Sequence, residues 1–429
     1  MTEMSERDNP AISYCGIYFI AFIANLGSFM YGFDFGMTSW CMMSINDLAK
    51  LTTTSSSSYY YIVSNSPGLY VLVAAGSSIG ASITFIFLLF FGNEIPKHDE
   101  IKLAAILFAI GALLESISGS VSWNSGPEGL IFLLLGRFIY GAGMACSSHS
   151  VPIYVSEQIP QNFRGTIGAY TETFIVAGIV VSFIIGYFYS DDTWVVLFRV
   201  GSCIALVLLF LSIFLPPSPK WLLRTKSGDR SDILEAYQFI FPNAKEDSVD
   251  KLQQIFENEK IERRKWEEQW KEQQQRKQTR KNENDFFFSA TTIERLFCMS
   301  SSSSPPSASA PPPSSVSEVQ ILFSNSSLFR CLLLAVSMAV LQMASGQAAI
   351  FYFSGEIFEL VCPDSEYECI LGLGVIKLIA AFSMTFIGEC WGRRTFLLLG
   401  TSVLFTGLFV FTICLASLDF TGALIGLFV

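Results

Sequence analysis

Charge is scarce in this chain of 429 residues, and so are the residues that build most catalytic and metal sites. Asp, Glu, Lys and Arg make up 15% of it, whereas soluble proteins carry about a quarter. Only two histidines occur, His98 and His149, far apart in the sequence, which argues against a histidine-based catalytic triad or a zinc site. Neither a phosphate-binding loop nor a dinucleotide-binding glycine fingerprint is present. We therefore expect no enzymatic site, no metal and no cofactor.

A basic surface for nucleic acid is also missing. The Lys and Arg residues of segment 263–281 alternate with Glu and belong to no nucleic-acid-binding motif. This composition favours a solvated helix. The sequence therefore predicts no nucleic-acid partner.

Apolar residues are abundant instead, at 51% of the chain with a mean hydropathy of +0.46. They cluster in runs long enough to cross a hydrocarbon layer of about 30 Å as helices. The expected helices cover residues 13–43, 67–91, 101–122, 128–153, 166–189, 193–215, 328–357, 369–389 and 393–416, and a tenth run opens near 420. The pattern predicts an all-α polytopic membrane protein with nine full spans and part of a tenth.

The positions of Lys and Arg predict an orientation and a division of the chain. They gather in the connections after the second, fourth, sixth and eighth helices, which indicates a cytoplasmic N-terminus. We expect a cytoplasmic N-terminus over 1–12, a six-helix bundle over 13–219 and a partial bundle over 326–429. Between the bundles, residues 220–325 form a cytoplasmic linker with a charged helix and a Ser/Pro-rich low-complexity segment.

Five short motifs occur in order along the chain. They are GFDFG at 32–36, GRFIYGAGMACSSHSVPIYVSEQIPQNFRG at 136–165, LPPSPKWLL at 215–223, LQMASGQAAIFYFS at 341–354 and ECWGRR at 389–394. Together they resemble the sugar porter family of the major facilitator superfamily. The resemblance implies two six-helix halves joined by a cytoplasmic linker, and the chain ends before the last helices of that pattern.

Two residues place unlike charges inside apolar helices. A lone charge at the centre of a bilayer costs about 2.5–3.5 kcal/mol on insertion scales, so Asp34 and Arg137 are expected to pair with each other. The resemblance implies that this pair couples transport to protons, as it does in symporting members of the family. A permanent structural ion pair remains the alternative.

The resemblance also implies a substrate site, from which this sequence departs. Gln342 and Gln347 are amide side chains of the expected kind, but Glu172 and Lys377 stand where the family usually has neutral amides. Amides suit hydroxyl groups because they donate and accept. A Glu and a Lys facing one cavity suit each other or a charged ligand.

A gate at the cytoplasmic side is the third expectation from the resemblance. Glu157 and Arg164 match its first-half residues, and Glu389, Arg393 and Arg394 match those of the second half. Topology-setting charge and helix capping are the alternative role for these residues. The loop LFFGNEIPKHDE, at 89–100, lacks the basic pair that the family carries there.

The sequence thus predicts an integral membrane protein, of the plasma membrane, that carries a hexose, a polyol or a related small polar solute through the lipid bilayer by alternating access. Coupling to protons is one version of this prediction. A facilitative sugar transporter is the first alternative, and a non-transporting sensor or truncated transporter-like protein is the second.

Overall fold

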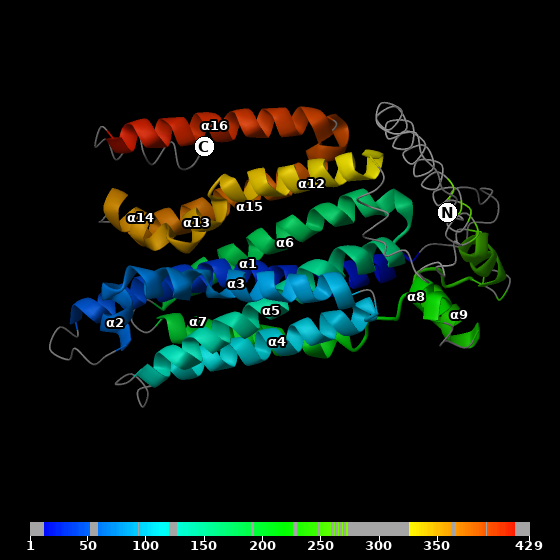
Figure 1. The fold of residues 1–429 in the computed structure, drawn as a ribbon, viewed down its shortest axis with the longest axis horizontal. Coiled ribbons are helices and arrows are strands. Elements are labelled where there is room, and N and C mark those ends of the chain that lie inside the picture. Colours follow the sequence, from blue (N-terminus) through cyan, green and yellow to red (C-terminus); the bar gives the residue numbers. More distant parts are fainter. Residues whose placement is uncertain are drawn as a thin grey trace, which may run out of the picture. The chain divides into compact units, whose positions relative to one another are not determined.

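The protein is described here from a computed structural model. It describes residues 13–51, 59–92, 94–119, 127–189, 193–225, 230–244, 246, 249–258, 261, 265, 268, 272, 326–362, 365–391 and 393–416. Within these residues every regular element is a helix, as the sequence predicts (Figure 1). The chain divides into two compact units, one of residues 1–245 with 342–429 and the other of residues 246–341.

The long helices of the first half follow the apolar runs, and short helices join or follow them. They are α1 (Tyr14–Leu51), α2 (Tyr59–Asn65), α3 (Pro67–Phe91), α4 (Lys97–Ser118), α5 (Pro127–Gln158), α6 (Gln161–Phe188), α7 (Thr193–Ser212), α8 (Pro219–Thr225) and α9 (Arg230–Gln238). The later helices are α12 (Ser326–Ala344), α13 (Gln347–Tyr352), α14 (Ser354–Val361), α15 (Glu366–Trp391) and α16 (Arg393–Ala416).

Eight helical segments among the described residues are long and apolar enough to cross a membrane. They correspond to the first eight predicted spans. The ninth predicted span is present as α16, whose apolar stretch Leu397–Ile413 is shorter than the others. The tenth run, from residue 420, lies outside the described residues.

The continuous helix predicted over 328–357 was wrong in one respect, because the chain breaks it twice. Gly346 has a φ of 76° and precedes α13, a left-handed conformation that only glycine adopts readily. Phe353, with a φ of −106° and a ψ of 18°, separates α13 from α14. Apolar periodicity does not reveal these breaks, because the longer stretches on both sides of them remain largely apolar.

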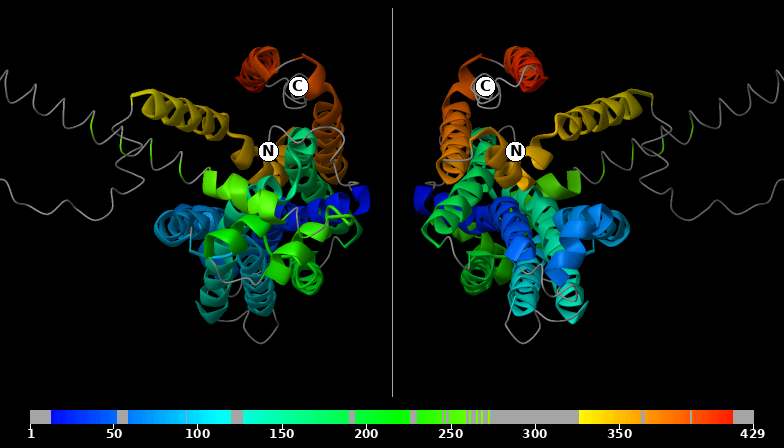
Figure 2. Two further views of the ribbon diagram at one scale, coloured as in Figure 1. Left: turned by 90° about the vertical axis from the view of Figure 1, so that its right-hand side faces the viewer. Right: turned by 90° about the vertical axis from the view of Figure 1, so that its left-hand side faces the viewer.

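Glycines let the helices of the first unit approach closely. A Cβ on Gly141 of α5 would overlap the carbonyl oxygen of Ser77 of α3, and one on Gly32 of α1 would overlap that of Ile175 of α6. Small residues at such contacts are how membrane helices pack. In both views of Figure 2, α1 (dark blue) lies among the other helices of this unit, and it contacts α5, α6 and α7.

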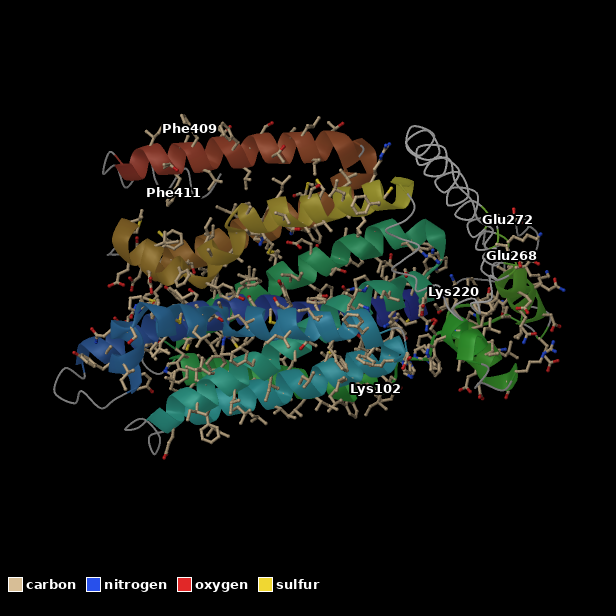
Figure 3. All side chains as sticks on the ribbon, viewed as in Figure 1. Lys102, Lys220, Glu268, Glu272, Phe409 and Phe411 are labelled. Atoms are coloured by element: carbon tan, nitrogen blue, oxygen red, sulfur yellow. The ribbon has the colours of Figure 1, made fainter. Side chains whose placement is uncertain are left out.

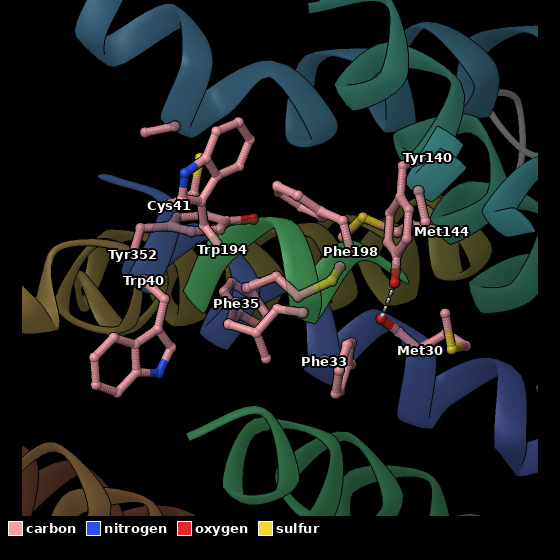
Figure 4. Packing of buried hydrophobic residues seen from close by; sticks show 14 of the residues in the cluster. Met30, Phe33, Phe35, Trp40, Cys41, Tyr140, Met144, Trp194, Phe198 and Tyr352 are labelled. Atoms are coloured by element: carbon pink, nitrogen blue, oxygen red, sulfur yellow. Dashed lines mark hydrogen bonds between the residues drawn. The ribbon is translucent and has the colours of Figure 1, made fainter. Parts of the chain in front are cut away.

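The core of the first unit surrounds the middle of α1. Figure 4 shows Tyr140 against Met30, where the Tyr140 hydroxyl donates to the Met30 carbonyl oxygen over 2.9 Å. Phe35 and Tyr352 pack in the same cluster with ring centroids 4.8 Å apart. A residue of α13 therefore belongs to the core formed by the first-half helices.

Candidate functional site

Asp34 and Arg137, the two charges in apolar helices, form an ion pair. Asp34 lies in the middle of α1 and Arg137 on α5, and Arg137 Nη1 is 2.7 Å from Asp34 Oδ1. Their side chains are 0% and 1% exposed. The tertiary structure thus brings together the residues that the cost of a lone intramembrane charge predicts to be partners.

Uncharged groups form the remaining hydrogen bonds of this ion pair. Arg137 Nη2 donates to Thr38 Oγ1 over 2.6 Å and to Ser77 Oγ over 3.1 Å, and Arg137 Nε donates to the Val73 carbonyl oxygen over 3.2 Å. Ser77 Oγ in turn donates to Asp34 Oδ2 over 2.8 Å. Charge-assisted hydrogen bonds of this kind are short and strong, so the pair is tied to three helices.

A second buried carboxylate, missed by the sequence reasoning, faces the same guanidinium. Glu115 on α4 is 0% exposed, and its Oε1 lies 3.8 Å from Arg137 Nη1. Neither of its carboxylate oxygens has a hydrogen-bond partner among the described residues. Glu115 interrupts an apolar helix as Asp34 does, so the same argument applied to the third predicted span finds it.

Tyr352 connects this cluster to α13. Its hydroxyl donates to Asp34 Oδ2 over 3.4 Å and lies 3.3 Å from Ser78 Oγ. The sequence reasoning passed over Tyr352, which follows an apolar stretch and carries no charge. Because of this contact, the state of Asp34 bears directly on a helix of the second half.

Polar side chains also link the C-terminal part of α1 to α14. Ser39 Oγ lies 2.7 Å from Ser354 Oγ, and Asn46 Nδ2 donates to Glu356 Oε1 over 3.1 Å. Burial raises the pKa of Glu356, the hydrogen bond from Asn46 lowers it, and the nearby Glu359 raises it, with a net upward shift. These hydrogen bonds therefore join the N-terminal helices of the first unit to its C-terminal helices at this end.

A cavity of about 370 Å³ opens beside the cluster, and it contains all four predicted substrate residues. It is lined by residues of α1, α5, α6, α13 and α15 together with the end of α12: Ser28, Tyr31, Phe35, Ser148, Pro152, Thr171, Glu172, Ile175, Gln342, Met343, Gln347, Ala348, Phe351 and Lys377. The wall thus combines a few polar groups with apolar ones, as is usual for sites of small ligands.

The two charges of this cavity remain apart. Lys377 Nζ lies 4.3 Å from the ring centroid of Phe351, a cation–π geometry. Glu172 and Lys377 form no ion pair within 4.0 Å in the part of the chain that the structure describes. Both charges are therefore available to a solute in the cavity.

The structure describes the side chains of two of the five predicted gate residues. Glu157 Oε2 is buried with no hydrogen-bond partner among the described residues, and Arg164 Nε donates to the Ile159 carbonyl oxygen over 2.8 Å. The side chains of the other three predicted gate residues, Glu389, Arg393 and Arg394, lie outside the described ones. The gate network stays a prediction.

A different charged cluster occupies the start of α4, where the family's basic loop signature is absent. Lys97 Nζ lies 2.9 Å from Glu100 Oε2, and His149 Nδ1 of α5 lies 2.7 Å from Glu100 Oε1. Figure 3 shows Lys102 near this end of α4. Within the described ranges, no three His, Cys, Asp or Glu residues are grouped so as to hold a metal ion.

Comparisons with known proteins agree with this architecture. The family described as "Sugar (and other) transporter" matches residues 20–288 and 308–428. The D-xylose-proton symporter-like 3, chloroplastic, of Arabidopsis thaliana is 32% identical over 200 residues, which cover 46% of this chain and 33% of that protein. The arabinose-proton symporter of Escherichia coli (strain K12) is 21% identical over 98% of this chain and 72% of its own length.

Solved structures show the same fold. The partially occluded inward-open conformation of the xylose transporter XylE from E. coli matches with a TM-score of 0.67 and 17% identity, covering 97% of this chain and 84% of that one. The matches to the first two curated relatives cover only 33% and 43% of those proteins' lengths. On its family match the chain belongs to the sugar transporter family, and its fold is that of the xylose transporter XylE, a protein of the major facilitator superfamily.

Proposed function

We propose that this protein carries a hexose, a polyol or a related small polar solute across a membrane by alternating access. The observation that carries the proposal is the cavity of about 370 Å³, which collects polar side chains from both halves of the first unit. Relatives named D-xylose-proton symporter-like 3, arabinose-proton symporter and putative polyol transporter 1 support the substrate class.

Within this proposal, Glu172, Gln342, Gln347 and Lys377 hold the solute. The two glutamines donate to and accept from hydroxyl groups, while Glu172 and Lys377 supply charge-assisted hydrogen bonds. Phe351 offers an apolar face in the same wall. This division between polar edges and an apolar face suits a sugar or polyol.

Alternation requires the contacts between α1 and α14 to open and close. The Ser39–Ser354 and Asn46–Glu356 hydrogen bonds hold the halves together at that end. We place this end outside the cell and the N-terminus inside, because Lys and Arg gather at the opposite connections. The predicted residues Glu157, Arg164, Glu389, Arg393 and Arg394 then form the cytoplasmic gate, and the plasma membrane is the proposed location.

Contact with the lipid bilayer follows from the outer faces of the helices. Large apolar side chains remain exposed there, such as Leu89 at 71%, Phe90 at 70% and Phe405 at 72%. Extensive exposed apolar surface marks an interaction site. Hydrocarbon chains of lipid are its natural cover in a protein with spans of this length.

Coupling to protons is proposed at Asp34. The carboxylate accepts from Arg137, Ser77 and Tyr352, and protonation removes its negative charge and one of its acceptor positions. The Tyr352 contact then weakens, which frees α13 to move with the solute. In this way a proton on α1 changes the contact between the two halves.

The test is Asp34→Asn in the full chain reconstituted into vesicles. We expect the variant to lose proton-driven accumulation of solute but to keep exchange of labelled solute across the membrane. Asp99→Asn, at a carboxylate that is 49% exposed, is the matched control and should behave as the wild type. Accumulation against a gradient by Asp34→Asn would contradict coupling at this residue.

A facilitative transporter is the second candidate, favoured by the complete burial of the Asp34–Arg137 pair. A static pair predicts uptake that leaves external pH unchanged and persists after an uncoupler is added. If no sugar shows flux but a sugar raises the unfolding temperature, the chain instead acts as a sensor.

A further inference from the structure

The cluster around Arg137 contains more negative than positive groups. Two carboxylates, Asp34 and Glu115, face one guanidinium, and all three side chains are at most 1% exposed. A buried site with an uncompensated charge is strongly unfavourable. One proton bound to the cluster restores neutrality.

The other ionisable groups around the cluster supply no second cation. Tyr140 on α5, Cys41 on α1 and Tyr352 on α13 interact with it, and all three are of types that are neutral at neutral pH. Arg199 on α7, which also packs against α4, directs its Nε to Ser116 Oγ over 3.2 Å. It forms no ion pair with Glu115 within 4.0 Å among the described residues.

The hydrogen bonds distinguish the two carboxylates. Asp34 accepts from Arg137 over 2.7 Å, from Ser77 over 2.8 Å and from Tyr352 over 3.4 Å. Among the residues that the structure describes, none donates a hydrogen bond to either Glu115 carboxylate oxygen, and Glu115 Oε1 lies 3.8 Å from Arg137 Nη1. Donors stabilise an ionised carboxylate, so Asp34 is the ionised member and Glu115 the member that holds the proton.

The chain leaves room for this side chain. A Cβ on Gly136, the residue before Arg137, would lie 2.6 Å from Glu115 Cγ. The absence of that Cβ allows Glu115 to reach the level of Arg137 between α4 and α5. The contact between α4 and α5 therefore accommodates the Glu115 side chain.

We propose that Glu115 is a proton-binding site, protonated at neutral pH while Asp34 is ionised and paired with Arg137. The site itself is independent of the proposed function. Its use in transport rests on that function: the O–H bond breaks at Glu115 and forms at Asp34, and Arg137 moves from Asp34 to the new Glu115 carboxylate. The net charge of the cluster stays the same throughout this transfer, so no buried charge is left uncompensated.

Infrared spectroscopy of the purified full chain tests the site without any substrate. A protonated carboxylic acid has a C=O stretch that a carboxylate lacks. We expect this band at neutral pH in the wild type and its loss in Glu115→Gln. In Asp34→Asn the band should also be lost, because one carboxylate then faces one guanidinium and Glu115 ionises to pair with Arg137. Glu100→Gln is the matched control, because Glu100 is equally buried but contacts Lys97 and His149, and it should leave the band unchanged.

Isotope labelling shows whether the band belongs to a glutamate or to an aspartate. When glutamate carries ¹³C in its carboxyl group, the band of the wild type should shift, and ¹³C-labelled aspartate should leave it in place. Glu356→Gln, made in the labelled protein, accounts for the other glutamate with a raised pKa. A missing band, a shift with labelled aspartate alone, or a band that survives Glu115→Gln would overturn the proposal. Because no flux is measured, failure of the transport function cannot produce any of these results.

Discussion

The ion-pair cluster and the cavity lie side by side, yet they treat charge in opposite ways. In the cluster, Asp34 and Arg137 are almost fully buried and lie 2.7 Å apart. In the cavity, Glu172 and Lys377 are accessible and remain separate. A buried charge must find a partner inside the protein, whereas a charge on a cavity wall can be left for a solute. The difference separates groups that hold the helices from groups that bind.

The largest expected effect comes from removing the single cation of the cluster. Arg137→Met leaves Asp34 buried without its partner, and breaking a buried pair in this way costs about 3–5 kcal/mol. We expect a large loss of folded protein and a lower unfolding temperature in detergent. Asp34→Asn combined with Arg137→Met should recover part of the stability.

Arg199→Met serves as the control for that experiment. Arg199 lies on the neighbouring helix α7, and within the described part of the chain its side chain donates to Ser116. Its expected cost is that of an ordinary surface change, within about 0.5–1 kcal/mol. If Arg137→Met is as stable as Arg199→Met, the cluster does not hold α1, α3 and α5 together.

The cavity should respond in the opposite manner, with function affected and stability preserved. Lys377→Met removes a charge that lines the cavity without breaking an ion pair, so the unfolding temperature should change little. A hydrogen bond to a charged group contributes about 1.5–3 kcal/mol, and the apparent KM for uptake should therefore rise by about tenfold or more. Lys102→Met, at a lysine outside the cavity, is the matched control.

An unchanged KM in Lys377→Met would mean that the Lys377 side chain packs on Phe351 and does not bind the solute. Glu172→Gln restores the amide usual in the family and sharpens this test. We expect a smaller change in KM than for Lys377→Met, because the amide still accepts hydrogen bonds from hydroxyl groups.

The smallest effect is expected at Glu356, whose side chain is partly buried. Its pKa is raised in the folded protein by burial, so the protonated form is favoured on folding. Its stabilising contribution is complete below its ordinary pKa of 4.5 and is lost as pH rises through the raised value. The unfolding temperature should therefore fall slightly over that interval, and Glu356→Gln should remove this component. An identical pH profile in the variant would show that Glu356 does not contribute.

The free-energy cost of placing a charge in an apolar helix explains which parts of the site could be predicted from the sequence. Asp34 and Arg137 stand out because each is a lone charge in an apolar helix, and Glu115 carries the same signal in the third predicted span. Tyr352 could not be recognised in this way, since a tyrosine near the end of an apolar run has many suitable environments. The contact of His149 with Glu100 could not be predicted either, because the two residues lie on different helices and are 49 positions apart in the sequence.

The sequence by itself determined that this chain is a bundle of membrane helices with a buried unlike-charge pair, because the cost of charge in hydrocarbon depends only on residue type and segment length. Only the tertiary structure decided that Arg137 faces two carboxylates, that Tyr352 reaches Asp34, and that Glu172 and Lys377 stay apart in one cavity. The reason is geometric. Helix rotation, the close approach allowed by glycines such as Gly136 and the break at Gly346 set which side chains meet.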